Sequence, residues 1–411
     1  MYSDKNDVLP QVLSKPKVSL FSISIAFFQV GITAFGFSIV QKIKSLVIQK
    51  GWLTQEEVDE GMALVQLYPG PIMVDFTAYT GYKLRGVIGA LLATLGFILP
   101  SFILIVILSA AYFASGDLPW VHPLFTGLEA IIVGIIINVT FDFGSRSLKG
   151  RIEALIAFAA FTALLFKVNA LLIVLSALLM GALLLKPQKN NAKSSMLPVL
   201  STEKNSWRIW LPILAVVAVI LAGVAYSGWL NSDIGRMGLA FFKIGSVAFG
   251  NGFTLLPLIQ NEVLDNHQWL TPNQFADGIA LSQITPGPFL IMSAFAGYKM
   301  GGLGAALLMT FAMFAPSFAM TLIFTEVFSK LKNLGFIKGA LNGVLASFVG
   351  LLAVVTLQLG KTGITGPASL ALAAGAFISV HYFKLDILWV FLGGLLIWVG
   401  VLALGITAIH F

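Results

Sequence analysis

The chain has 411 residues, of which 58% are hydrophobic and only 10% are charged, and its mean hydropathy is +0.92. These residues supply too little polar surface for a soluble globule of this length, so the composition predicts a polytopic membrane protein with the lipid bilayer as a partner. The absence of cysteine excludes disulfides and cysteine nucleophiles. We interpret the net charge of +7 as Lys and Arg of cytoplasmic loops, and we expect no nucleic acid as a partner.

The N-terminal residues are polar, and no short apolar core with a small-residue cleavage site is found there, so we expect residues 1–19 to be a cytoplasmic tail and no removable signal peptide. Apolar stretches near the length of a spanning helix, about 20 residues, then recur along the chain. The expected segments of the first half are 20–40, 55–83, 87–113, 124–143, 151–167 and 168–186. A polar linker near 187–207 and one unmatched apolar segment near 209–230 separate them from segments at 237–256, 272–299, 303–327, 336–359, 366–382 and 385–405.

The two halves contain the same series of motifs. Gly61 to Pro71 (Gly-Met-Ala-Leu-Val-Gln-Leu-Tyr-Pro-Gly-Pro) aligns with Gly278 to Pro288 (Gly-Ile-Ala-Leu-Ser-Gln-Ile-Thr-Pro-Gly-Pro). The other matching pairs are Phe27-Phe28 with Phe241-Phe242, Phe35-Gly36 with Phe249-Gly250, Trp52-Leu53-Thr54 with Trp269-Leu270-Thr271, Gly81-Tyr82-Lys83 with Gly297-Tyr298-Lys299, and Pro100-Ser101-Phe102 with Pro316-Ser317-Phe318. One chain therefore holds two copies of one unit. We expect a first transporter repeat at 20–186, a linker with a connecting transmembrane helix at 187–235, and a second repeat at 236–411.

The number of segments predicts the orientation of the repeats. Six crossings return the chain to its starting side, so the single connecting segment inverts the second repeat relative to the first, giving an all-α protein of about 13 segments. The Lys and Arg expected on the cytoplasmic face are Arg146, Lys149, Arg151, Lys186, Lys189, Lys193, Lys204, Arg208, Lys330, Lys332 and Lys338. Lys42, Lys44 and Lys50 do not fit this threading. They fit a second one, in which the first segment breaks at Phe35-Gly36 and the Pro-Gly-Pro segment is re-entrant, and both threadings stay open.

The Pro-Gly-Pro sequences predict two discontinuous helices. Proline inside a helix costs about 3 kcal/mol or more, and the backbone groups that it frees cannot face lipid. Capping boxes at Thr54/Glu57 and Thr271/Gln274 start a helix at the same place in both copies, and that helix stops at the proline after about 14 residues, or about 21 Å, which is too short to cross. A kink that serves packing alone is the alternative.

A helix that restarts after the break attracts anions. We expect Pro71 and Pro288 to be the first residues of the next helices, so that the following amides point without partners into the break. The positive end of the helix dipole then adds to their attraction for an anion. These amides belong to Ile72, Met73 and Val74 in the first copy and to Phe289, Leu290 and Ile291 in the second.

Several polar residues in apolar sequence are candidates for ion binding. Lys243 either balances an anion or extends its ammonium to the membrane interface. Asp75 either carries a coupling proton or pairs with a lysine, and Glu129 with Asp142 suggests a proton relay on one segment. Gln66 and Gln283, each three residues before a break, either donate to an oxyanion or bond carbonyls freed by proline. Asn138 is interpreted as an interhelical hydrogen bond.

These motifs resemble the chromate ion transporter family of the long, two-domain type. The resemblance rests on Phe249-Gly250-Asn251-Gly252, Trp269-Leu270-Thr271, Asp277-Gly278, Gln283 to Pro288, Gly297-Tyr298 and Pro316-Ser317-Phe318, and on their counterparts in the first half. The first copy departs from the pattern, with Phe37-Ser38 in place of Asn251-Gly252 and Glu60 in place of Asp277. The resemblance implies export of chromate across the inner membrane of a bacterium, with chromate resistance as the result.

Together these features predict a secondary transporter of an inorganic oxyanion, an antiporter in the plasma membrane with its N-terminus in the cytoplasm. A carrier or channel for sulfate or another small anion is the alternative. The expected substrate-binding residues are Gln66, Pro69, Gly70, Pro71, Ile72, Met73, Gln283, Pro286, Gly287, Pro288, Phe289, Leu290, Phe35, Gly36, Phe249, Gly250, Asn251, Gly252 and Lys243, and the expected coupling residues are Asp75 and Glu129. We expect no catalytic residue, cofactor or metal, and a homodimer is an open expectation. Gly360-Lys361-Thr362 lacks the glycine that a phosphate-binding loop needs at position 355, which argues against ATP drive in this chain.

Overall fold

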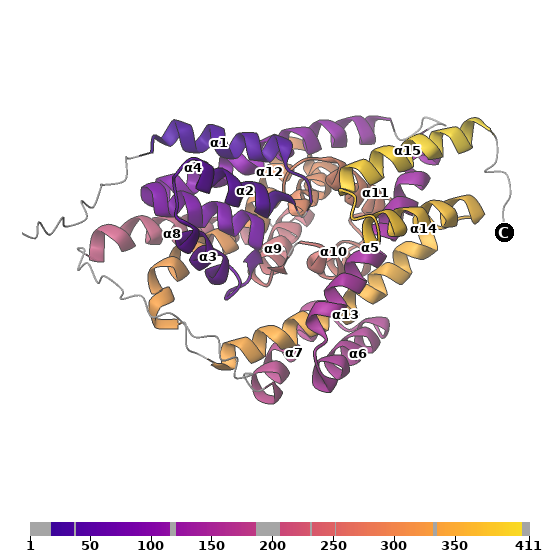
Figure 1. The fold of residues 1–411 in the computed structure, drawn as a ribbon. Helices are drawn as coiled ribbons and strands as arrows, with labels where there is room; N and C mark the ends of the chain where they lie inside the picture. Colours follow the sequence, from indigo (N-terminus) through magenta and orange to yellow (C-terminus); the bar gives the residue numbers. More distant parts are fainter. Residues whose placement is uncertain are drawn as a thin grey trace, which may run out of the picture.

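The computed structural model describes residues 18–36, 38–115, 121–185, 206–230, 232–250, 252–331 and 335–404, and nearly all of these residues are helical (Figure 1). The first half contains α1 (Leu20–Thr33), α2 (Ser38–Gln49), α3 (Gln55–Leu64), α4 (Ile72–Ala114), α5 (Val121–Ser147), α6 (Arg151–Leu165) and α7 (Ala170–Leu184). After α8 (Ser206–Trp229), the second half contains α9 (Asp233–Ser246), α10 (Leu256–Gln260), α11 (Pro272–Ile284), α12 (Met292–Leu331), α13 (Gly335–Gly363), α14 (Pro367–His381) and α15 (Ile387–Ala403). The expected all-α class is confirmed.

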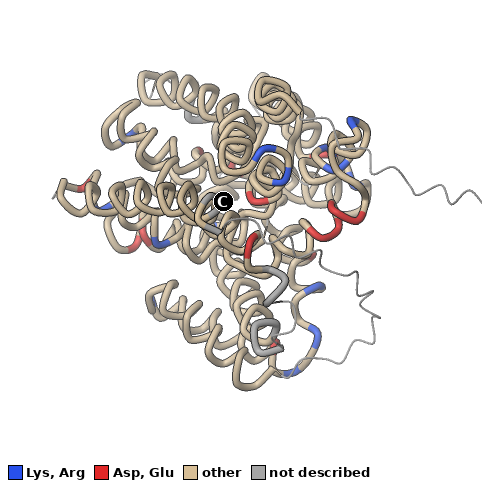
Figure 2. Tube along the Cα trace, turned by 90° about the vertical axis from the view of Figure 1, so that its left-hand side faces the viewer, with Lys and Arg blue, Asp and Glu red and all other residues tan. Residues whose placement is uncertain are grey.

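Among the described helices, five are long and apolar enough to cross a membrane: Ile72–Ala114, Pro123–Ser147, Trp210–Trp229, Phe289–Val327 and Gly339–Gly363. Four further apolar helices, α1, α7, α14 and α15, are shorter. Large apolar side chains on several helices are exposed, such as Leu155 at 66% on α6 and Leu183 at 82% on α7, as expected where lipid takes the place of water. Charged residues are sparse along the helices in Figure 2. The molecule is therefore a multi-pass membrane protein, and the count of 13 segments stays a prediction.

The long helices α4 and α12 are each two helices that fold back on themselves. Gly86 has φ of 63° and Gly302 has φ of 63°, and both interrupt the helical backbone. On either side of the first turn the chain approaches itself so closely that a Cβ on Gly81 would lie 2.3 Å from the Gly89 carbonyl oxygen. Residues eight apart in one straight helix are about 12 Å apart along its axis, so this contact requires a hairpin. The expected boundaries between segments at 83/87 and 299/303 agree with these turns.

The first expected segment, 20–40, is two helices instead of one. α1 ends at Thr33, Ala34 is extended, and α2 begins at Ser38. Gly36 has φ of 50°, a left-handed conformation that a helix cannot contain. The break at Phe35-Gly36, which belonged to the second threading, is therefore present.

The helix ends at the Pro-Gly-Pro sequences also differ from expectation. Both capping boxes are present, and α3 and α11 start at Gln55 and Pro272 as predicted. However, α3 ends at Leu64, well before the proline. Pro71 has an extended backbone, with ψ of 105°, because Gly70–Pro71 (β1) pairs with Phe249–Gly250 (β2), so proline is the N-cap and not the first helical residue. Pro288 is likewise the N-cap of the 3₁₀ turn Phe289–Ile291 that precedes α12.

Helices from the two halves are packed side by side. α13 of the second half lies against α6 and α7 of the first half, and α14 and α15 lie against α5, as can be followed in Figure 1. The hairpins α4 and α12 also pack on each other. The two Pro-Gly-Pro breaks consequently lie inside one body, next to residues of the opposite half.

Candidate functional site

Each Pro-Gly-Pro break lies against the end of the first helix of the other half. At the first break, Gly70 and Pro71 pair in parallel with Phe249 and Gly250, which follow α9. At the second break, the Gly287 amide donates a 2.9 Å hydrogen bond to the carbonyl of Ala34, which follows α1. The structure thus brings together predicted site residues that are far apart in the sequence.

Gly287 is needed for this contact at the second break. Its φ of 108° is a conformation that side chains disfavour. A Cβ at this position would also lie 2.3 Å from Oγ of Ser101, a residue of α4 in the first half. Only glycine lets the second break approach the first half this closely.

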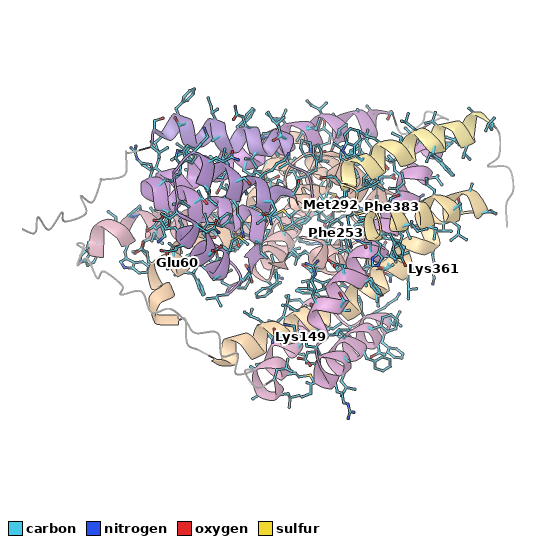
Figure 3. The ribbon with its side chains drawn as sticks, in the orientation of Figure 1. Glu60, Lys149, Phe253, Met292, Lys361 and Phe383 are labelled. Carbon is cyan, nitrogen blue, oxygen red and sulfur yellow. The ribbon has the colours of Figure 1, made fainter. Side chains whose placement is uncertain are left out.

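A small cavity lies at the second break. Figure 3 shows one of its lining residues, Phe253, in the centre of the molecule. Five of its lining residues are predicted site residues, namely Gly36, Met73, Gln283, Gly287 and Phe289. The remaining lining residues are Ile39, Phe253, Ser282 and Thr285.

The free hydrogen-bond donors at this cavity are N–H groups. The hydroxyls of Ser282 and Thr285 donate to the carbonyls of Gly278 and Leu281, each at 2.7 Å, so their protons are already used. The side chain of Gln283 is only 7% exposed, and its Nε2 has no hydrogen-bond partner. A buried amide donor without a partner is costly, and a ligand with acceptor oxygens removes that cost.

The start of the helix after Pro288 adds to this donor set. Proline has no side-chain acceptor, and no side-chain hydrogen bond caps this end. The amide of Ile291 bonds the Pro288 carbonyl at 3.0 Å, so it is not among the free donors expected from the sequence. The amides of Phe289 and Leu290 at the start of this turn, with the Gln283 side chain, therefore form a donor set suited to an anion, and no charged side chain lines the cavity.

The first break is built differently, although its sequence matches. Gln66 is exposed, whereas Gln283 is buried. Asp75, in the first turn of α4, is fully buried, and a Cβ on Gly70 would lie only 1.7 Å from its Oδ2. A carboxyl group of the chain itself therefore occupies the space beside this break. No lysine forms an ion pair with Asp75 in the described part of the chain, so its predicted alternative role is not found there.

Glu129 lies at a second contact between the halves. It is 6% exposed and interacts with Asp277 of α11, which accepts a 2.6 Å hydrogen bond from the Tyr112 hydroxyl. Asp277 is not among the predicted site residues, although its replacement by Glu60 in the first copy is a signal in the sequence. Asp142, the other proposed relay residue, pairs with Arg146 on its own helix at 2.8 Å.

The remaining predicted residues lie away from the cavity or around it. Lys243 is exposed on α9 and does not line the cavity. Gly252 contacts the region, since its Cβ would lie 3.3 Å from Phe289 and 3.4 Å from Leu290. Asn251 lies outside the described residues. The predicted residues that flank the breaks without lining the cavity are Phe35, Pro69, Ile72, Pro286 and Pro288.

Two further interactions involve polar residues that the sequence singles out. Lys42 donates from Nζ to the carbonyl of Thr33, the last residue of α1, where a cation is favoured by the helix dipole. The pattern of loop charges alone gives no indication of this role for Lys42. Asn138 bonds Nδ1 of His381 on α14 at 2.9 Å, which confirms the expected interhelical hydrogen bond.

Comparison with known proteins gives the same family twice along the chain. The family model "Chromate transporter" matches residues 21–182 and again residues 235–399. Among curated relatives, an uncharacterised transporter of Methanocaldococcus jannaschii is 29% identical over 83% of this chain and 84% of its own length. Proteins named chromate transport protein from Cupriavidus metallidurans and Pseudomonas aeruginosa are each 28% identical, over 86% and 92% of this chain and 86% and 91% of their own lengths. No solved structure matches. Since the family model covers most of both halves, the chain belongs to the chromate transporter family.

Proposed function

We propose that this chain is a secondary transporter that exports an inorganic oxyanion, with chromate as the first candidate. The observation that carries the proposal is the cavity at the second break, where the buried and unpartnered Gln283 amide lies beside an uncapped helix start. A tetrahedral oxyanion offers acceptor oxygens to both groups at once. Relatives named chromate transport protein, aligned over most of the chain, support chromate as the cargo.

A carrier or channel for sulfate or another small anion is the second candidate. The cavity favours this candidate because N–H donors and aromatic walls select for negative charge and size. None of the lining groups distinguishes the central atom of one tetrahedral anion from that of another. Chromate and sulfate are both tetrahedral dianions, so the same donors serve either one.

The two halves are proposed to be inverted repeats that rock against each other to move the anion. Each break is anchored on the other half, through Gly287 with Ala34 and through Gly70 with Phe249, as expected for two units related by a two-fold axis. α8 is the unmatched helix between them, and one additional crossing inverts the second unit. A site enclosed between two such units opens to one side at a time when they move.

The proposed setting is the inner membrane of a bacterium, with the N-terminus in the cytoplasm and with ion-gradient-driven antiport as the mode of transport. Export would then lower chromate inside the cell and confer resistance. Asp75 and Glu129 are the proposed coupling residues, because both are buried carboxyl groups at contacts between the halves. Expression of the chain in a chromate-sensitive host, with survival scored against chromate concentration, tests direction and resistance together.

The transport assay uses the purified full chain in liposomes. Radiolabelled chromate and sulfate are supplied separately, with and without an imposed pH gradient. Saturable uptake with counterflow supports a carrier, and flux that rises linearly with concentration and shows no counterflow supports the channel. Failure of both anions to cross would overturn the assignment of an oxyanion as cargo.

A further inference from the structure

Asp75 has an unusual set of neighbours at the first break. The side chain is 0% exposed, and neither carboxyl oxygen has a hydrogen-bond donor within bonding geometry. The groups that interact with it are the hydroxyls of Ser317 and Thr321 on α12 of the second half, with the Tyr68 ring close by. A buried ionised carboxylate normally requires donors or a cation, and none of the described residues supplies a cation here.

The Ser317 and Thr321 hydroxyls beside Asp75 each have another hydrogen-bond acceptor on their own helix. Ser317 Oγ donates to the Phe314 carbonyl at 3.2 Å, and Thr321 Oγ1 donates to the Ser317 carbonyl at 3.0 Å. The Tyr68 hydroxyl donates to Thr321 Oγ1 at 2.8 Å. A hydroxyl has a single proton, so while these bonds are kept the Ser317 and Thr321 oxygens present only lone pairs to Asp75.

In that arrangement an ionised Asp75 carboxylate faces only acceptor oxygens, and a proton between them removes the repulsion. With a proton on one Asp75 oxygen, the carboxyl becomes a donor, and Ser317 Oγ or Thr321 Oγ1 accepts from it. A proton needs no additional volume, whereas a metal cation needs space for several oxygens around it. The tight contact of Asp75 with Gly70 leaves no such space on that side.

Other charged groups packed against this region have partners of their own. Lys42 of α2 bonds the Thr33 carbonyl, and Glu57 of α3 bonds the Thr54 amide at 2.8 Å. Glu326 of α12 accepts a 2.6 Å hydrogen bond from Tyr82. Tyr68 is the titratable side chain that interacts with Asp75, and its own proton is donated to Thr321.

The second break has no equivalent of this carboxyl group. The residue that matches Asp75 is Met292, which is labelled in Figure 3, and the residue that matches Ser317 is Ser101, which lies beside Gly287. The repeated architecture therefore carries a carboxyl at one break and free N–H donors at the other.

We propose that the two breaks have divided functions: the second break binds the anion, and Asp75 at the first break binds the proton that is exchanged during transport. On binding, a proton adds to a carboxylate oxygen, an O–H bond forms, and the neutral carboxyl donates to Ser317 or Thr321. When the halves separate, water reaches Asp75 and the proton leaves. The coupling step rests on the proposed function, whereas the presence of the proton does not.

Infrared spectroscopy tests the proton without any transport assay. In the purified full chain at neutral pH, the wild type minus Asp75→Asn difference spectrum is expected to contain the C=O stretch of a protonated carboxyl group. Asp142→Asn is the matched control, because that acid is paired with Arg146 and is expected to show no such band. If Asp75→Asn fails to fold, Ser317→Ala is used, and the same band is expected to move to higher frequency because one acceptor is lost. Absence of the band, or a spectrum that responds to Na⁺ instead of to pH, overturns the proposal.

Transport in liposomes tests the coupling. Asparagine resembles a permanently protonated Asp75, so Asp75→Asn is expected to keep chromate or sulfate counterflow and to lose accumulation driven by a pH gradient, together with anion-dependent proton flux reported by an internal pH dye. Gradient-driven accumulation equal to the wild type overturns the coupling role. A wild type that moves neither anion and still shows the infrared band leaves the proton site standing and refutes the proposed function.

Discussion

The Asp75 carboxyl group packs directly on the Cα of Gly70, so that a methyl group on residue 70 would lie 1.7 Å from Oδ2. The glycine of the first Pro-Gly-Pro sequence is thus fixed by a side chain only five residues later in the same chain. At the second break the corresponding glycine is fixed by Ser101 of the other half. Two sequences that look alike are therefore held by different neighbours.

Gly70→Ala is expected to destabilise the protein, because the added methyl and the buried carboxyl cannot share one space. Overpacking of this kind costs about 1–3 kcal/mol. Thermal unfolding in detergent, followed by size-exclusion chromatography of the heated sample, measures the change. Gly304→Ala is the control, since nothing lies within 4 Å of a Cβ there. The double variant Gly70→Ala with Asp75→Ala is expected to recover part of the loss. Equal melting temperatures for Gly70→Ala and Gly304→Ala would contradict the contact.

The helical hairpins give a second test of packing. A Cβ on Gly297 would lie 2.6 Å from the Ala305 carbonyl oxygen, which is backbone and cannot move aside. Gly297→Ala is therefore expected to force the two legs of α12 apart and to lower the melting temperature by the equivalent of about 1–3 kcal/mol. Gly375→Ala on α14, where a Cβ meets nothing within 4 Å, is expected to have little effect. A melting temperature for Gly297→Ala as high as that of the control would show that the hairpin is looser than described.

Local signals in the sequence predicted the parts of the fold that local chemistry determines. Thr54 and Thr271 cap their helices in the expected boxes, because capping depends on residues three positions apart. The expected boundaries between segments at 83/87 and 299/303 agree with the hairpin turns, where Gly81 and Gly297 lie at the contact between the two legs. Proline and glycine likewise marked the breaks.

Packing between the halves was not predictable from one sequence. Gln66 and Gln283 occupy matching positions, and only the arrangement of neighbouring helices exposes the first and buries the second. The pairing of Tyr112 with Asp277 joins residues 165 apart, and no local pattern indicates it. Lys243 was selected for its charge in an apolar segment, but the direction in which a helix presents a side chain depends on what packs against it.

Phe253 is expected to limit the size of the anion. Its ring stacks on that of Phe289, with centroids 4.6 Å apart and planes 12° apart, and both rings line the cavity. Phe253→Ala removes one wall, so molybdate, a larger tetrahedral oxyanion, is expected to compete better for chromate uptake than it does in the wild type. Phe242→Ala is the control, because that buried ring contacts Phe311 and does not line the cavity. An unchanged ratio of molybdate to chromate inhibition in Phe253→Ala would remove this ring from selectivity.

The matched glutamines provide the sharpest test of which break binds the anion. Gln283 is buried at the cavity with a free Nε2, whereas Gln66 is exposed, so the substitution to leucine has different consequences at the two positions. A hydrogen bond to a charged ligand contributes about 1.5–3 kcal/mol, so Gln283→Leu is expected to raise the chromate concentration that gives half-saturation about 10-fold or more. Gln66→Leu is expected to keep the half-saturating chromate concentration within about twofold of the wild-type value, since an exposed amide exchanges its bonds with water at little cost. Counterflow in liposomes over a range of chromate concentrations gives both values from the same assay. Equal losses would mean that the two breaks share the anion, and a loss confined to Gln66→Leu would place the site at the first break, against the division of function proposed above.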